Sequence, residues 1–210
     1  MCGRYTTEIE TDERELFRML ARAEANTNSG SAVSMTSGKP LVREVFPSEP
    51  AAVLTADAGG GIDVHLFRWG YPTEIAGKRR LLINARSETA AEKPMFSDGL
   101  LYRRCVIPTA GFFEWAHVGG RADTDRKYRF NLPHTGILYL AGFFRPSYTA
   151  AGTCEFLILT REANVSMAPI HDRMPVIVRE EHIAEYLADA AAARQLLYET
   201  PPMLLKKLVS

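Results

Sequence analysis

Short apolar segments of about four to eight residues recur along most of this chain after residue 50. They are rich in β-branched and aromatic residues, and stretches rich in Gly and Asp, such as DAGGG, separate them. Such segments are typical of β-strands, and their number predicts a mainly antiparallel sheet or open barrel. The expected strands are residues 51–54, 62–69, 81–84, 105–108, 111–115, 127–131, 137–144, 155–159 and 175–178.

An amphipathic helix is expected near the N-terminus, over residues 12–25. Leu16, Leu20 and Ala23 recur on one side at helical spacing. Acidic residues crowd the first turn, and Thr11 can cap the helix start. This helix is expected to pack one apolar side against the sheet.

The remainder of the chain completes the expected fold. Residues 26–40 are rich in Ser, Asn, Gly and Thr, which predicts a loop. A second helix is expected over residues 180–198, with Ile183, Tyr186 and Leu187 on one face. No internal repeat or interdomain linker is visible, so residues 1–210 are expected to form one α+β domain with helices flanking the sheet.

Composition indicates a soluble protein in a reducing compartment such as the cytoplasm. The chain is 46% hydrophobic, but no apolar run approaches the ~20 residues that span a membrane. Its first residues, MCGRYTTEIETDE, lack the apolar core of a secretory signal. Three widely spaced cysteines without a CxxC pair argue against a disulfide framework or a zinc site. Cys105 and Cys154 lie in apolar runs and are expected to be buried; no metal or cofactor is predicted.

The overall charge gives no indication of a nucleic-acid partner. The sequence has 25 basic and 25 acidic residues and a net charge of zero. Bulk electrostatic attraction to nucleic acid is therefore excluded, and any DNA affinity must come from a local cluster of arginines.

Cys2 carries two nucleophiles if Met1 is removed. The new α-amine titrates near neutral pH, so part of it is uncharged and can condense with an aldehyde. The neighbouring thiol can then close onto the imine carbon and form a five-membered thiazolidine ring. Taken alone, a Cys at position 2 is more often accidental, with a frayed terminus around it.

Asn84 is the last residue of the run LLIN, and Arg86 lies two positions further along the chain. They share a face if the strand continues. The Asn amide can donate to a carbonyl oxygen, and Arg can bind a phosphate with two hydrogen bonds. An ordinary strand-end turn is the alternative.

Glu114 lies in the aromatic segment GFFEW. Alternation places Phe112 and Glu114 on one face of a strand, with Phe113 and Trp115 on the other. A buried carboxylate in such surroundings can serve as a general acid or base near neutral pH. The alternative is an exposed Glu on the outer face of the sheet.

His171 lies in the segment IHDRMP, directly before an expected strand. Histidine is the usual proton carrier near neutral pH, although a structural His is the more common case. The adjacent Asp172 also suggests a metal phosphohydrolase, but no further His and Asp partners are visible.

Arginines lie in or beside these segments, among them Arg4, Arg86, Arg104 and Arg173. If the segments converge, they form a basic groove that can follow a phosphate backbone. Trp69, in RWGYP, offers either a stacking surface for a base or a core side chain.

The motifs MCGRY, RWGYP, INARSET, GFFEW and IHDRMP, in this order, resemble those of the SRAP family (SOS-response-associated peptidase), a group of abasic-site processing proteins. The resemblance extends from residue 1 to about residue 178. It implies a β-rich α+β fold and covalent attachment to abasic sites in single-stranded DNA. It also implies autoproteolytic removal of Met1 and a role in the SOS response to DNA damage.

The resemblance assigns roles residue by residue. Cys2 forms the thiazolidine, and Asn84 positions the opened sugar. Glu114 is the acid or base for ring opening and for reversal of the crosslink, in a lyase-type reaction. His171 transfers a proton during imine formation.

Further matches place Arg4 and Arg86 on phosphates and Arg173 near the site. Two departures are visible: Glu44 stands where the family usually has Asn, and the segment YPTEIAGKRR lacks the family's second tryptophan.

Two other functions are compatible with the residues. One is a thiol peptidase or amidase that uses Cys2, His171 and Asn84 on external peptides. The other is a non-catalytic module for single-stranded DNA. Under the implied function, the partner is single-stranded DNA with abasic sites, and the protein is a monomer. It would act at the nucleoid in bacterial cytoplasm, or in the nucleus of a eukaryote.

Overall fold

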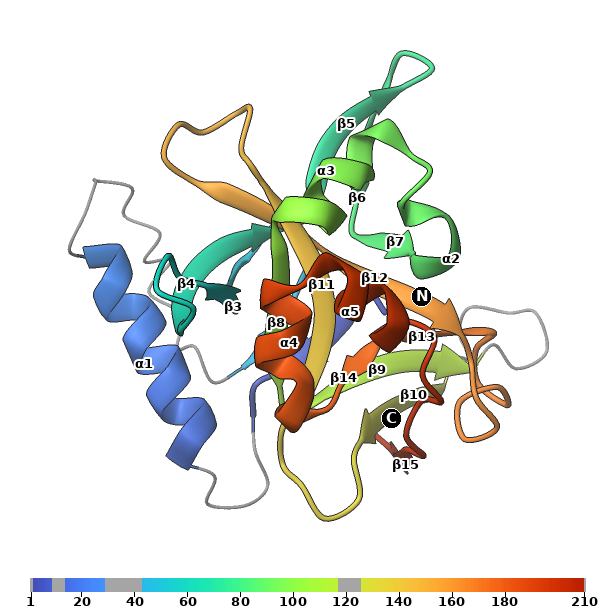
Figure 1. Cartoon of the computed structure of the whole chain (residues 1–210). Coiled ribbons are helices and arrows are strands. Elements are labelled where there is room, and N and C mark those ends of the chain that lie inside the picture. Colours follow the sequence, from blue (N-terminus) through green and yellow to red (C-terminus); the bar gives the residue numbers. More distant parts are fainter. Residues whose placement is uncertain (1, 9–13, 29–42, 117–125, 210) are drawn as a thin grey trace.

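The largest sheet has eight strands and forms the centre of the molecule (Figure 1). The computed structural model describes residues 2–8, 14–28, 43–116 and 126–209. Within them, the sheet contains β3 (Pro50–Ala56), β4 (Ile62–Trp69), β7 (Asn84–Arg86), β8 (Arg104–Thr109), β11 (Leu138–Pro146), β12 (Cys154–Glu162), β13 (Arg173–Pro175) and β14 (Ile177–Val178).

Five of these strands form a closed ring. Strand β11 pairs with both β8 and β12, and β12 also pairs with β4 in parallel. The path β12–β4–β3–β8–β11 therefore returns to its start. The prediction of a mainly antiparallel α+β fold is confirmed. The closure depends on the parallel contact of Phe156 with Trp69, which no local sequence pattern encodes.

A second sheet places the N-terminus. It has the order β15–β10–β9–β1–β2, so β1 lies between two partners. Its strands are β1 (Arg4–Thr6), β2 (Glu44–Val45), β9 (Gly111–Ala116), β10 (Arg126–Asn131) and β15 (Leu205–Leu208). The pairing of β1 with β9 and β2 shows that the terminus is anchored in a sheet rather than frayed.

Two predicted strands are each divided in the structure. The run at 81–84 is shared between β6 (Lys78–Leu82) and β7, and the run at 175–178 is shared between β13 and β14. Strand β6 forms a separate hairpin with β5 (Tyr71–Ile75), which projects at the top of Figure 1. Division after Leu82 lets the chain leave the hairpin and join β12 through β7.

Strand alternation divides the core into two apolar clusters. In β3, Ala51 and Val53 face a cluster that contains Cys2 and Tyr5, between the two sheets. Ala52 and Leu54 face the other cluster, which the helices cover. Because successive side chains of a strand point to opposite faces, one strand serves both clusters.

The helices are α1 (Arg14–Asn28), α2 (Ser87–Ala90), α3 (Pro94–Tyr102), the 3₁₀ turn η2 (Glu180–His182), α4 (Ile183–Ala188) and α5 (Ala190–Leu196). In α1, Leu16, Leu20 and Ala23 are buried as predicted. The helix continues three residues into the predicted loop; Thr11 and residues 29–40 lie outside the described part.

The prediction of one helix over residues 180–198 is wrong. Asp189 adopts extended dihedrals, with φ −114° and ψ 121°, and so separates α4 from α5. Its carboxylate accepts from the N–H groups of Ala191 and Ala192 at 2.6 and 3.0 Å, which caps α5. No helix in the described part of the chain is long and apolar enough to cross a membrane.

Candidate active site at the N-terminal strand

Cys2 is buried directly before β1. Only 1% of the residue is exposed, and its Sγ lies 3.7 Å from the Arg4 carbonyl oxygen, to which it donates. Burial raises the pKa of the thiol, and the nearby Glu114 carboxylate raises it further. The thiol is therefore protonated at neutral pH. Of the other cysteines, Cys105 is buried as predicted, but Cys154 is only partly buried.

Asn84 contacts Cys2 directly. Strand β7 runs parallel to β12, with Asn84 opposite Ile158. The Nδ2 of Asn84 donates to the Cys2 carbonyl oxygen at 2.9 Å. This contact also assigns the amide orientation, because a carbonyl oxygen only accepts. Oδ1 of Asn84 is buried and has no hydrogen-bond partner within the described residues, so it can accept a hydrogen bond from a ligand.

Glu114 is buried in β9, with 4% of the residue exposed. The alternative of an exposed Glu on an outer face is therefore excluded. Arg4 pairs with Phe113 across the two strands, and continuing this antiparallel register brings Gly3 level with Glu114. The carboxylate is close enough to the Cys2 sulfur to raise the pKa of the thiol. Structure thus brings Cys2, Asn84 and Glu114 together.

His171 lies in the turn that precedes β13 and is partly buried. Its Nδ1 accepts the backbone N–H of Arg173 at 2.9 Å, so the neutral ring carries its proton on Nε2. Nδ1 also lies 2.8 Å from Asp172 Oδ1, a contact in which Nδ1 donates only if it carries a proton. The turn packs Met167 into the same apolar cluster as Cys2. A proton transfer between His171 and the Cys2 site stays a prediction.

Two of the predicted arginines lie beside acidic side chains. Arg173 binds both oxygens of Glu88 at 2.7 and 2.8 Å, and this hydrogen bonding lowers the pKa of Glu88. Arg4 lies 3.6 Å from Glu44. Arg86 is exposed and has no ion pair with any described residue.

Two predicted DNA contacts are wrong in this structure. Arg104 is buried and donates to the carbonyl oxygens of Tyr186 and Leu187 at 2.6 and 2.8 Å, so its guanidinium closes the end of α4. Trp69 is fully buried, and its Nε1 donates to the Ile83 carbonyl oxygen at 3.0 Å. Neither side chain has a surface that can reach DNA.

Sequence reasoning missed the group around Arg4. Its guanidinium lies 4.6 Å from the ring centroid of Phe46 and 5.0 Å from that of Trp115. Lys127 binds Glu44 at 2.8 and 2.9 Å from the opposite side. The sequence signal for this group was Glu44, which stands where the family usually has Asn. A carboxylate added near a cation predicts a local ion pair.

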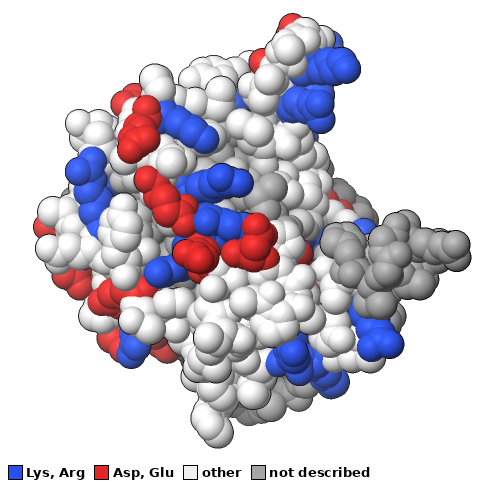
Figure 2. Space-filling view, turned by 90° about the vertical axis from the view of Figure 1, so that its right-hand side faces the viewer, with Lys and Arg blue, Asp and Glu red and all other residues white. Residues whose placement is uncertain are grey.

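Basic and acidic side chains are interspersed over the middle of the face shown in Figure 2. Among the described residues, Arg173 pairs with Glu88 and Lys127 pairs with Glu44. The expectation of a basic groove therefore depends on the cations that have no acidic partner among the described residues.

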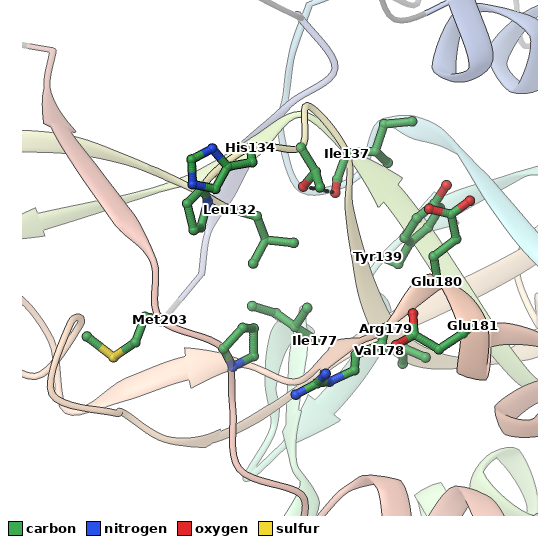
Figure 3. Close-up of a pocket in the computed structure, with 13 residues that line it drawn as sticks. Leu132, His134, Ile137, Tyr139, Ile177, Val178, Arg179, Glu180, Glu181 and Met203 are labelled. Atoms are coloured by element: carbon green, nitrogen blue, oxygen red, sulfur yellow. Dashed lines mark hydrogen bonds between the residues drawn. The ribbon is translucent and has the colours of Figure 1, made fainter.

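A groove of about 720 Å³ lies elsewhere, between the turn at 132–137 and the start of η2 (Figure 3). Leu132, Ile177 and Met203 contribute apolar side chains to it, and Glu180 and Glu181 lie at one end. None of the four predicted catalytic residues lines this groove.

Sequence comparison identifies the class of protein to which this site belongs. The family described as SOS response associated peptidase (SRAP) matches residues 1–207. The chain belongs to this family, and the resemblance predicted from the motifs is confirmed.

Individual relatives are named as abasic site processing proteins. YoaM of Bacillus subtilis is 35% identical over 150 residues, which cover 68% of this chain and 64% of YoaM. YedK of Escherichia coli is 29% identical over 128 residues, which cover 60% of this chain and 56% of YedK. The matched region thus spans less than two thirds of each of these relatives.

Solved structures share the fold. A protein from Bacteroides thetaiotaomicron superposes with a TM-score of 0.73 at 22% identity, covering 100% of this chain and 92% of the other. A protein from Bordetella bronchiseptica has a TM-score of 0.72, also at 22% identity, with 100% of both chains covered. These likenesses establish the fold alone.

Proposed function

We propose that this protein processes abasic sites by forming a thiazolidine crosslink between Cys2 and single-stranded DNA, after removal of Met1, in the response to DNA damage. The observation that carries the proposal is the hydrogen bond from Asn84 to the Cys2 carbonyl oxygen. It fixes the first residues of the chain beside a carboxylate and a buried amide oxygen. Membership of the SRAP family and the names of the relatives support abasic-site processing as the coarser function.

The chemistry starts from the amine. Burial keeps the thiol of Cys2 protonated, whereas an α-amine at this position titrates near neutral pH. The neutral amine attacks C1 of the open-chain sugar aldehyde, and the resulting carbinolamine loses water to give an imine. The sulfur then adds to the imine carbon, and the thiol proton is transferred to the nitrogen. The ring forms with the net release of one water.

The neighbouring residues supply positioning and proton transfer. Glu114 protonates the departing hydroxyl and, in the reverse direction, accepts the proton of the attacking water. Oδ1 of Asn84, which has no hydrogen-bond partner among described residues, accepts from a sugar hydroxyl. His171, with its proton on Nε2, donates to the opened sugar. Arg86 contacts a phosphate.

The raised pKa of Cys2 disfavours the peptidase alternative. A thiol peptidase needs a thiolate as its nucleophile, and reactive cysteines lie where neighbouring groups lower the thiol pKa. Here burial and Glu114 both raise it. Single-stranded DNA carrying an aldehyde is therefore the better substrate.

A gel experiment tests the proposal. Incubation with abasic single-stranded DNA should give a heat-stable adduct, which Cys2→Ala should abolish. Cys154→Ala is the matched control, because this thiol is partly exposed and lies outside the site. It should react like the wild type. An undiminished adduct with Cys2→Ala would refute the proposal.

A further inference from the structure

The β5–β6 hairpin is a tight, projecting arm. Its pairing runs from Tyr71–Leu82 at the base to Ile75–Lys78 at the tip. Ala76 and Gly77 form the turn, with φ of 51° and 73°. Positive φ at both central positions is typical of a type I′ turn, whose twist matches that of the strands. A Cβ added at Gly77 would meet nothing within 4 Å, so the tip lies in open space.

The base of this arm is attached to the Cys2 site. Trp69, two residues before β5, donates to the carbonyl oxygen of Ile83, directly after β6. The next residue, Asn84, holds the carbonyl oxygen of Cys2. Arg80 lies four positions before Asn84, a span of at most about 13 Å in an extended chain. The arm therefore begins at the site and leads away from it.

Three consecutive cations lie on the outer half of the arm. Lys78, Arg79 and Arg80 are exposed, and none forms an ion pair with a described residue. Figure 2 shows basic side chains along this projection at the top of the molecule. Arg79 lies opposite Glu74, whereas Arg80 lies opposite the uncharged Thr73. By strand alternation, Lys78 and Arg80 share one face, and Arg79 lies on the other.

We propose that Lys78 and Arg80 bind phosphates of the DNA strand on one side of the nucleotide held at Cys2. This inference rests on the proposed function, because it takes single-stranded DNA as the ligand. It is supported by the ion pairs that hold Arg173 on Glu88 and Arg4 near Glu44, a carboxylate that Lys127 also binds. The hairpin carries a row of three exposed cations that form no ion pair with a described residue, and this row leads along the chain to Asn84. The position of the arm therefore determines whether DNA on the 5′ or on the 3′ side of the nucleotide at Cys2 contributes to binding affinity.

Equilibrium binding tests the hairpin separately from crosslinking. The probes are fluorescent single strands with a tetrahydrofuran abasic analogue, which has no aldehyde and forms no adduct. One strand extends only 5′ of the analogue, and the other extends only 3′. The variant is Lys78→Gln/Arg80→Gln. The control, Arg18→Gln/Arg194→Gln, removes the same charge from exposed positions on α1 and α5.

The hairpin variant should bind one of the two strands roughly tenfold more weakly at about 0.1 M salt. The slope of log affinity against log salt should fall by about 1.4, since each phosphate contact contributes about 0.7 on single strands. The other strand and the control variant should show wild-type affinity. The exchange Lys78→Arg/Arg80→Lys keeps both charges and should restore binding.

Equal affinity of the hairpin variant and the wild type for both strands would overturn this inference, as would an equal loss on the two flanks. The covalent assay is separate. If the wild type forms no Cys2-dependent adduct with abasic DNA, the proposed chemistry fails, while the flank-specific loss of binding can still be measured.

Discussion

The side-chain amide of Asn84 donates to the main-chain carbonyl oxygen of Cys2 at 2.9 Å, across 82 positions of sequence. The contact joins β7 to the residue that precedes β1. It holds the backbone of Cys2 while leaving the Asn84 Oδ1 atom for a ligand. Residues near a chain terminus are normally among the least ordered of a domain; here this bond and the pairing of β1 fix the backbone of Cys2.

Asn84→Ala should slow adduct formation at least tenfold, because Cys2 loses the donor that fixes its carbonyl. The free energy of unfolding should fall by about 1–2 kcal/mol, the usual consequence of removing one partner of a part-buried hydrogen bond. Adduct rates and denaturant midpoints measure the two effects. Asn131→Ala is the control, since its amide donates only to the neighbouring Leu132 carbonyl oxygen. Unchanged adduct rates in Asn84→Ala would contradict this role.

Glu114→Gln should retain DNA binding and lose rate in both directions. The amide keeps the shape of the buried side chain but can neither give nor take a proton, so formation and reversal of the crosslink should each slow by about 10²-fold or more. Rapid-quench time courses with abasic DNA measure formation, and release from isolated adduct measures reversal. Wild-type rates in both assays would remove Glu114 from the mechanism.

The sequence predicted those parts of the candidate site in which the type of residue points to one kind of chemistry. Cys2, Asn84 and Glu114 stand in short motifs, and the structure brings these three together. The partner of Arg104 could not be predicted from the sequence, because a guanidinium can donate to a phosphate or to the carbonyl oxygens at a helix end equally well. Its choice of carbonyl partners depends on where α4 ends, which is a property of the tertiary fold.

Glu44→Gln should strengthen binding to single-stranded DNA several-fold. The carboxylate lies 3.6 Å from Arg4 and 2.8 Å from Lys127, and its removal frees two cations for phosphates. The salt dependence of binding should become steeper by the same argument. Fluorescence anisotropy over a salt series measures both. Glu181→Gln, at an exposed position in η2, should leave affinity and slope nearly unchanged; if it matches Glu44→Gln, the effect reflects net charge alone.

Arg104→Met should destabilise the protein by about 3 kcal/mol without changing its affinity for DNA. The guanidinium donates to the carbonyl oxygens of Tyr186, Leu187 and Leu100, which become buried acceptors without donors. Chemical denaturation and anisotropy measure the two quantities. Arg194→Gln, which removes an exposed charge on α5, should change neither. A loss of DNA affinity in a folded Arg104→Met protein would restore Arg104 as a DNA contact.

The fold was predictable to the level of strands and of the first helix. Residues 62–69 form a strand with the predicted bounds, because alternation and bounding turns are local signals. Asp189 shows where local signals mislead: its surroundings favour a helix on both sides, yet it ends α4 and caps α5. The ring of strands closes where Trp69 pairs with Phe156, two residues far apart in the sequence. This closure depends on tertiary packing, which the periodicity of the sequence does not predict.

The intact mass of the crosslinked product tests the central claim most directly. Protein incubated with abasic single-stranded DNA and purified under denaturing conditions should have the mass of the chain without Met1, plus the DNA, minus one water. Cys2→Ala should give no such species. A product that retains Met1, or one that forms equally well with Cys2→Ala, would contradict attachment through the α-amine and sulfur of Cys2.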